Sequence, residues 1–135
     1  MKRTYFALAR GRVKAGGSVD APIGRHPVHR TRMAVVAGGK PAVTHYKIRE
    51  AFPEHTLLEC SLETGRTHQI RVHLASIGHP IVGDPVYGKR GPRVLERQAL
   101  HAWKLAFVHP RSGKTVEFES PLPGDFRALL ESLRP

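Results

Sequence analysis

Cysteine is nearly absent from this sequence, which excludes one common way of stabilising a small chain. Cys60 is the only cysteine among 135 residues, so no disulfide can form within the chain. Chains that use no disulfides are typical of reducing compartments. The basic N-terminal residues are followed by too short an apolar stretch for a secretion signal. We therefore predict a cytoplasmic protein.

Long apolar runs are missing as well. No stretch approaches the roughly 18 apolar residues that a membrane-spanning helix needs. The sequence also shows no basic amphipathic helix and no lipidation signal, the features that bring a chain to a membrane surface. We therefore expect no membrane partner.

The motifs of metal sites and of hydrolases are a third absence. The chain has nine histidines but no pair of cysteines and no His-Glu-x-x-His. His68 and His73 are five positions apart, a spacing that does not place two ligands on one helical face. No Gly-x-Ser-x-Gly stretch marks a nucleophilic serine. We predict no metal and no cofactor.

Negative charge is scarce relative to positive charge. Lys and Arg number 22 against 11 Asp and Glu, which gives a formal net charge of +11. An excess of this size points to a polyanionic partner such as a nucleic acid. Basic surfaces also occur on proteins that bind no nucleic acid, because net charge affects solubility as well as association.

The length and the apolar periodicity predict one α+β domain. A chain of 135 residues can bury a single core. Strands come first, a central helix follows, and strands and a closing helix end the chain. This order predicts a mixed, largely antiparallel sheet with few helices, in which 42–51 and 55–63 pair as a hairpin. The predicted strands are 3–10, 18–22, 32–36, 42–51, 55–63, 100–108 and 115–119.

Side-chain patterns predict which faces are buried. The strand at 3–10 carries apolar residues on both sides, so we expect both its faces to be covered. In 100–108 we expect Trp103, Leu105 and Phe107 to face inward. Two helices are predicted from apolar spacings of three and four residues. The first uses Ile70, Leu74 and Ile77 and stops at Gly78; the second uses Phe126, Leu129, Leu130 and Leu133 and is capped by Asp125.

The segment from Thr64 to His73 combines features of an anion-binding site. Thr64-Gly65-Arg66-Thr67 leads from a strand into a helix, where free backbone N–H groups attract phosphate. His68 and Arg71 are three residues apart and share one helical face. The same pattern is typical of an ordinary amphipathic helix with a solvated arginine, and periodicity alone favours that alternative.

Four segments together resemble one known family. They are KRTYFAL at 2–8, TGRTHQIRVH at 64–73, GHPIVGDPVYG at 78–88 and QALHA at 98–102. The chain is similar over residues 2–133 to the RluA/RluD-type ribosomal large subunit pseudouridine synthases. The resemblance implies an isomerase that converts uridine to pseudouridine in large-subunit ribosomal RNA or its precursor, without metal or cofactor.

The resemblance also implies roles for single residues. Tyr5 matches the tyrosine that packs against the flipped base, and Arg71 matches the arginine that pairs with an aspartate nucleophile. Arg66, His68 and Gln69 are expected to line the site or to contact RNA.

The aspartate nucleophile itself has no match in this sequence. Asp20, Asp84 and Asp125 are its only aspartates, and none lies in the family's Arg-Leu-Asp motif. Asp84 belongs to a Gly-Asp loop, where we expect a structural capping role. We therefore expect residues 1–135 to be the C-terminal portion of a catalytic domain that is inactive by itself. The alternative is a non-catalytic RNA-binding module derived from the same fold.

Two further basic clusters are candidate RNA contacts. Residues 24–32 carry Arg25, Arg30 and Arg32 and could follow a phosphate backbone. Lys89, Arg90, Arg93 and Arg97 form the second cluster. Solvated loops that bind nothing are the alternative for both clusters, and the sequence favours that alternative slightly less than RNA contact. Finally, the absence of upstream strands predicts that the Tyr5 strand has an open apolar edge, which leads either to self-association or to marginal stability.

Overall fold

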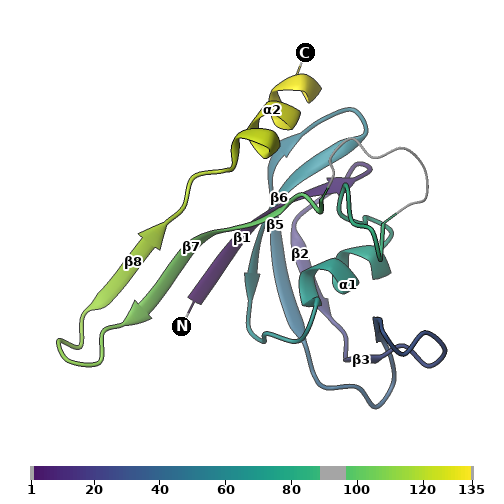
Figure 1. The fold of residues 1–135 in the computed structure, drawn as a ribbon, viewed down its shortest axis with the longest axis horizontal. Coiled ribbons are helices and arrows are strands. Elements are labelled where there is room, and N and C mark those ends of the chain that lie inside the picture. The colour runs from purple at the N-terminus through teal and green to yellow at the C-terminus, as the bar shows by residue number, and fades with distance from the viewer. Residues whose placement is uncertain (1, 89–96, 135) are drawn as a thin grey trace.

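The computed structural model describes residues 2–88 and 97–134, and within them the chain folds as one sheet with two helices and a small hairpin (Figure 1). The elements, in chain order, are β1 Lys2–Arg10, β2 Gly17–Asp20, β3 Ile23–Arg25, β4 Met33–Val35, β5 Val43–Ala51, β6 His55–Leu62, α1 Gln69–Ser76, β7 Leu100–Val108, β8 Thr115–Glu119 and α2 Gly124–Leu133.

The main sheet has six strands in the order β2-β5-β6-β1-β7-β8, and every neighbouring pair is antiparallel. The predicted α+β class and antiparallel sheet are therefore confirmed. So is the hairpin of β5 with β6, in which Tyr46 pairs with Cys60. Strands β3 and β4 form a separate two-stranded sheet. Its first strand lies in a stretch that the sequence predicted as loop, because three residues are too few to show a period.

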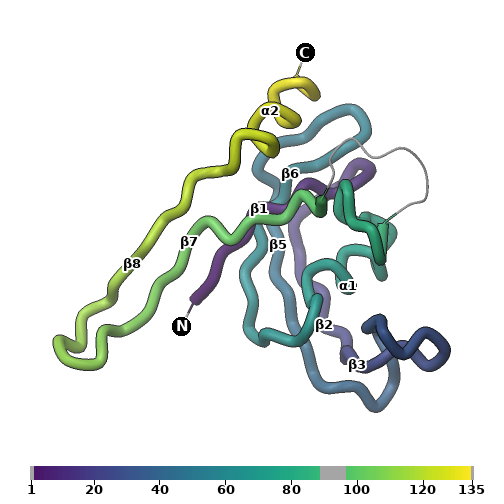
Figure 2. Tube along the Cα trace, in the orientation of Figure 1, coloured from purple at the N-terminus to yellow at the C-terminus, as the bar shows by residue number. Residues whose placement is uncertain are grey.

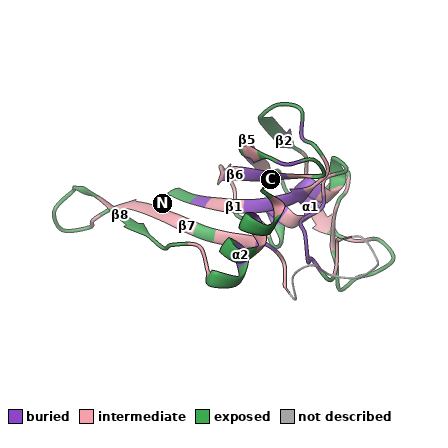
Figure 3. Cartoon of the chain, turned by 90° about the horizontal axis from the view of Figure 1, so that it is seen from above, coloured by how far each residue is buried: buried purple, intermediate pink, exposed green. Residues whose placement is uncertain are grey.

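The core lies where α1 packs against the middle of the sheet (Figure 3). Ala7, Leu8 and Ala9 on β1 are fully buried, so this half of the strand is covered on both faces, as predicted. Ile70 and Leu74 of α1 are buried as expected. Ile77 is 38% exposed, because α1 ends at Ser76 and the chain turns away at Gly78, whose φ is +85°.

The predicted open edge on the Tyr5 strand is wrong. β1 pairs with β6 on one side and with β7 on the other, so it lies inside the sheet. The second neighbour of β1 is β7, which lies nearly a hundred residues further along the chain. It pairs with the edge of β1 that was predicted to be open. The outer strands of the described sheet are β2 and β8.

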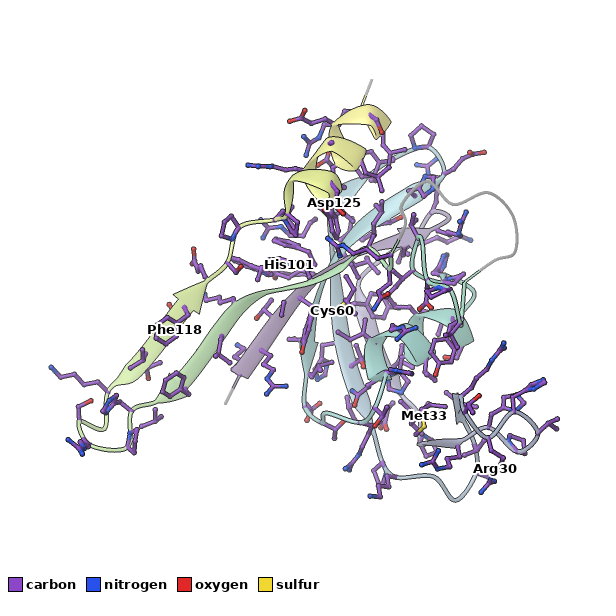
Figure 4. The ribbon with its side chains drawn as sticks, in the orientation of Figure 1. Arg30, Met33, Cys60, His101, Phe118 and Asp125 are labelled. Atoms are coloured by element: carbon purple, nitrogen blue, oxygen red, sulfur yellow. The ribbon has the colours of Figure 1, made fainter. Side chains whose placement is uncertain are left out.

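Strands β7 and β8 project from the core as a two-stranded arm, in a different direction from the β3–β4 hairpin (Figure 2). Trp103, Leu105 and Phe107 are only half-buried, so the predicted inward face is only partly covered. Trp103 stacks on Phe6 with ring centroids 4.9 Å apart. On β8, Phe118 is 57% exposed and lies out on the arm (Figure 4).

Helix α2 begins at Gly124, two residues earlier than predicted. Pro123 occupies the N-cap position, so the predicted cap at Asp125 is wrong. The Asp125 carboxylate lies in the first turn instead and forms an exposed ion pair of 3.1 Å with Arg97. Neither helix of the described residues is long and apolar enough to cross a membrane.

Candidate active site

A pocket of about 300 Å³ opens beside the N-terminal end of α1. It brings together Tyr5 from β1 and four residues from the segment that follows β6, although the two parts are about sixty positions apart in the chain. All five residues that the sequence predicted for the immediate site line it: Tyr5, Arg66, His68, Gln69 and Arg71. Their convergence depends on the position of β1 beside β6.

Tyr5 enters the pocket from a rigid strand. It pairs with Cys60 on one side and with Ala102 on the other, and its half-buried ring packs against the core. The pairing of β1 with β7 shifts register between Thr4 and Tyr5. Such irregularities re-aim side chains, and they are common beside active sites.

Arg71 is fixed by a carboxylate of this chain. Its Nε donates to Oδ2 of Asp84 at 2.8 Å, and its Nη2 donates to Oδ1 at 2.9 Å. The Asp84 side chain is fully buried and that of Arg71 is 11% exposed. Oδ1 of Asp84 also accepts the backbone N–H groups of Val86 and Tyr87, so the predicted capping role is present. The ion pair could not be predicted from the sequence, because it joins a helix to a turn 13 residues away.

The ion pair and burial act in opposite directions on Asp84. Burial alone would raise the pKa of this carboxyl. The hydrogen bonds from Arg71, Val86 and Tyr87 outweigh burial and hold its pKa below the usual value. The hydrogen bonds to Asp84 raise the pKa of Arg71 in turn. Both groups are therefore charged throughout the physiological range.

His68 stands at the mouth of the pocket in a left-handed conformation, with φ +56° as the N-cap of α1. Its Nδ1 lies 2.8 Å from the hydroxyl of Tyr87, which also accepts the backbone N–H of Met33 at 2.9 Å. With one lone pair used, Tyr87 can donate its proton to Nδ1, which leaves the proton of a neutral His68 on Nε2. Burial and the nearby Arg71 lower the pKa of His68 and favour this neutral form.

Tyr87 is the residue of the site that sequence reasoning missed. Its hydroxyl joins His68 to Met33, and its ring lies under the guanidinium of Arg71 at 5.1 Å. It therefore links the pocket to the β3–β4 hairpin. A tyrosine inside a Gly- and Pro-rich turn carries no periodic signal, and only the resemblance placed it near the site.

Gln69 lines the pocket but is committed to its own chain. The side chain is 3% exposed. Its Nε2 donates to the carbonyl of Val43 and to the hydroxyl of Thr44, while its Oε1 accepts from the hydroxyl of Thr64 and from the N–H of Arg66. These bonds hold the loop between β6 and α1 in place, so the geometry favours a positioning role over direct contact with RNA.

The expected phosphate-binding backbone is partly used within the protein. The N–H of Arg66 is taken by Gln69, whereas those of Gly65 and Thr67 meet no acceptor in residues 2–88 and 97–134. The Arg66 side chain donates from Nε to the carbonyl of Pro41 at 2.8 Å. This bond directs the guanidinium along the loop.

The basic hairpin lies next to this loop. Arg25, Arg30 and Arg32 are exposed, and Nη1 of Arg25 donates to the backbone carbonyl of Arg30. Figure 4 shows Arg30 on the outer loop of the hairpin and Met33 nearer its base, below α1. Of the second predicted cluster, Lys89, Arg90 and Arg93 lie outside the described residues. Arg97 is paired with Asp125.

No carboxylate lines the pocket among the residues that the structure describes. Asp84 lies behind Arg71, buried and bonded, while Asp125 belongs to α2 and Asp20 to the outer strand β2. No group of three His, Cys, Asp or Glu side chains with the spacing of a metal site occurs in the described part of the chain.

The fold and the site together define a class of protein. It is an α+β domain whose basic pocket is formed by a tyrosine on a strand and an arginine on a helix. The sequence model of the RNA pseudouridylate synthase family matches residues 1–76, more than half of the chain. The chain belongs to the RNA pseudouridylate synthase family.

Named relatives agree with this assignment. The chain is 61% identical to the ribosomal large subunit pseudouridine synthase D of Nitrosomonas europaea, over 99% of this chain and 41% of that protein. It is 53% identical to the protein of the same name from Escherichia coli K12, over 98% of this chain and 44% of the relative. The chain therefore spans about two fifths of the length of these relatives.

Solved structures show the same fold. The human RNA pseudouridylate synthase domain containing 1 superposes with a TM-score of 0.76 at 26% identity, over 98% of this chain and 65% of that one. The human RNA pseudouridylate synthase domain containing 4 superposes with a TM-score of 0.75 at 24% identity, over 98% of this chain and 62% of that one.

Proposed function

We propose that this chain binds uridine-containing RNA, specifically large-subunit ribosomal RNA or its precursor, and forms part of a pseudouridine synthase site. The observation that carries the proposal is that Tyr5 and Arg71 line one pocket in a member of this family. The net charge of +11 suits an RNA partner. The single cysteine is buried and unpaired, which is consistent with the cytoplasm as the site of action.

In the proposed reaction a uridine is turned out of the RNA and its base packs against Tyr5, since chemistry on a base requires its removal from the stack. The N1–C1′ bond breaks, the base rotates, and C5 bonds to C1′. The proton on C5 then leaves to solvent and N1 takes up a proton from solvent, so atoms and charge balance without a cofactor.

Arg71 is suited to hold a reacting carboxylate in its ionised form. Asp84 takes its Nε and Nη2, and Nη1 meets no acceptor among the described residues. A fixed guanidinium of this kind lowers the pKa of a carboxylate placed against its free edge. The family resemblance implies an aspartate nucleophile there, and we propose that a segment other than the described residues supplies it.

The second candidate is a non-catalytic RNA-binding module. The observation in its favour is the lack of a carboxylate in the pocket within the described residues. The two candidates share the RNA partner and differ in turnover.

Tritium release from ribosomal RNA labelled at C5 of uridine separates them, because that proton leaves only when pseudouridine forms. With the 135-residue chain alone, we expect RNA binding without release. Release would show that one of its own aspartates acts as nucleophile. Failure to bind RNA would overturn both candidates.

A chimera tests the catalytic role of the site. This chain replaces the matching 41% of the Nitrosomonas europaea synthase D, and we expect the chimera to release tritium. Arg71→Ala should nearly abolish release while RNA remains bound, and Arg71→Lys, which keeps the charge, should retain the folded state. Normal turnover in both variants would remove Arg71 from the proposed site.

We propose that the chain self-associates through the outer strand β8 and not through the Tyr5 strand. No described strand pairs with the outer side of β8, and β8 carries the exposed Phe118.

A further inference from the structure

A second and larger pocket, of about 460 Å³, lies between the β3–β4 hairpin, the Gly38-Gly39 turn and the loop that follows β6. Neither the family resemblance nor the site described above gives it a role. Its walls combine cationic side chains, apolar side chains and bare backbone.

Three cations surround this pocket: Arg25, Lys40 and Arg66. No carboxylate of the described residues lies within ion-pair distance of any of them. The backbone N–H groups of Gly65 and Thr67, which also line the pocket, meet no acceptor in the described chain. Uncompensated positive charge and residues with free N–H groups line the same cavity, a combination that favours an anion such as phosphate.

The remaining wall is apolar. Ile23 is 2% exposed and Met33 is half-buried, and both face the pocket. At Gly39 a Cβ would come within 2.7 Å of the carbonyl carbon of Ile23, so only glycine allows this close approach of the turn to β3. A wall of apolar side chains and glycine backbone suits the face of a planar base, and the volume is within the range of about 300–1,000 Å³ of small-ligand pockets.

The two pockets are adjacent. Gly65 and Arg66 line both of them, so the loop after β6 is the boundary between the Tyr5 pocket and the hairpin pocket. A Cβ added to Gly65 would meet nothing within 4 Å, so the space beside this residue, here called the passage, is open. Arg66 stands at the passage with its guanidinium held by the carbonyl of Pro41.

We propose that the hairpin pocket binds a nucleotide that neighbours the target uridine in the same RNA strand. Its base lies against Ile23 and Met33, and the phosphate between the two nucleotides lies at Arg66 with Lys40 close by. The RNA partner rests on the proposed function, whereas the pocket and its occupant are new. The hairpin pocket thereby gives the chain a means of reading the residue next to its target.

Binding of a fluorescent single-stranded RNA to the 135-residue chain, followed by anisotropy, tests the charge. Lys40→Gln should weaken binding about fivefold at 0.1 M salt, because one phosphate contact on a single strand contributes about 0.7 to the salt slope. Lys114→Gln is the matched control, since Lys114 is exposed on the turn of the β7–β8 arm. Gly65→Val should weaken binding by filling the passage while the melting temperature stays unchanged.

An abasic substitution tests the base contact. Removal of the base next to the target should weaken binding to the unaltered protein but have little further effect on Met33→Ala. If the abasic RNA binds the unaltered protein normally, and if Lys40→Gln and Gly65→Val behave like Lys114→Gln, the hairpin pocket takes no nucleotide. In that outcome RNA still binds, and the proposed function stands; loss of all RNA binding would instead overturn the proposed function.

Discussion

The guanidinium of Arg71 and the carboxylate of Asp84 form a two-point ion pair in which the carboxylate is fully buried. The pair has two consequences. It fixes the arginine that faces the Tyr5 pocket, and it anchors the turn that carries Tyr87 to helix α1. The site therefore depends on an acidic residue that does not itself line the pocket.

Removal of one partner should be costly for stability. Asp84→Ala leaves Arg71 without its carboxylate in a largely buried place, and we expect a loss of about 3–5 kcal/mol in the free energy of unfolding. Urea denaturation followed by circular dichroism measures it. Asp20→Ala is the control, because this exposed residue on β2 forms no ion pair in the described structure and should change stability by less than about 0.5 kcal/mol. Equal effects of the two changes would contradict a structural role for the pair.

The same pair should make stability depend on pH in the acid range. The pKa of Asp84 is lower in the folded than in the unfolded chain. Its contribution is therefore fully present above the ordinary carboxyl pKa of about 3.9 and is lost as the pH falls through the lower folded value. Urea midpoints measured from pH 6 to pH 3 should fall less steeply in Asp84→Asn than in the unaltered chain. Asp125→Asn removes an exposed carboxylate and should reduce the pH dependence of the urea midpoint less than Asp84→Asn does.

Much of the fold could be predicted because alternation and apolar spacing are local signals. The strands at β1, β5 and β6 and the helix α1 were predicted within a few residues. Two features could not be predicted in this way. The second neighbour of β1 is β7, which comes from far along the chain. The partner of Arg71 lies in a turn, and a turn has no periodic pattern of apolar residues.

The site likewise combines features that could be predicted from the sequence with features that depend on the three-dimensional fold. Tyr5 and Arg71 came from the resemblance, and folding placed them together because β1 lies beside β6. Gln69 lines the pocket as expected, but its burial could not be predicted, because a polar residue at a helix start reads as exposed in sequence. Its four hydrogen bonds within the chain are visible only in three dimensions.

Tyr87→Phe should change the tautomer of His68. The variant loses the hydroxyl that can donate to Nδ1 and that accepts from the N–H of Met33. In the unaltered chain, ¹⁵N chemical shifts should show neutral His68 protonated on Nε2 alone; in Tyr87→Phe a mixture of both tautomers should appear. Tyr46→Phe is the control, since Tyr46 lies on β5 away from His68. A single unchanged tautomer in both variants would show that Tyr87 does not orient His68.

Arg30→Ala should weaken RNA binding without regard to sequence. Arg30 lies exposed on the outer loop of the basic hairpin, where it can reach phosphate but faces neither pocket (Figure 4). We expect the slope of log affinity against log salt to fall by about one. Affinities for several unrelated RNA sequences at four salt concentrations measure this, with Arg111→Ala on the β7–β8 turn as the control. A loss confined to one RNA sequence would instead indicate a base contact.

Phe118→Lys should reduce self-association. Phe118 is 57% exposed on β8, the outer strand at one side of the sheet, and Val108 on the neighbouring strand is 64% exposed. An outer strand with open backbone groups and exposed apolar side chains can pair with a second copy, and a lysine at such an edge opposes that pairing. Size-exclusion chromatography with light scattering over a range of concentrations should show the unaltered chain shifting toward dimer and Phe118→Lys remaining monomeric. Val28→Lys is the matched control, since Val28 is 74% exposed but lies on the hairpin loop and not on an outer strand of the main sheet. If the unaltered chain is a monomer at every concentration, β8 does not pair with a second copy, and the proposed self-association is wrong.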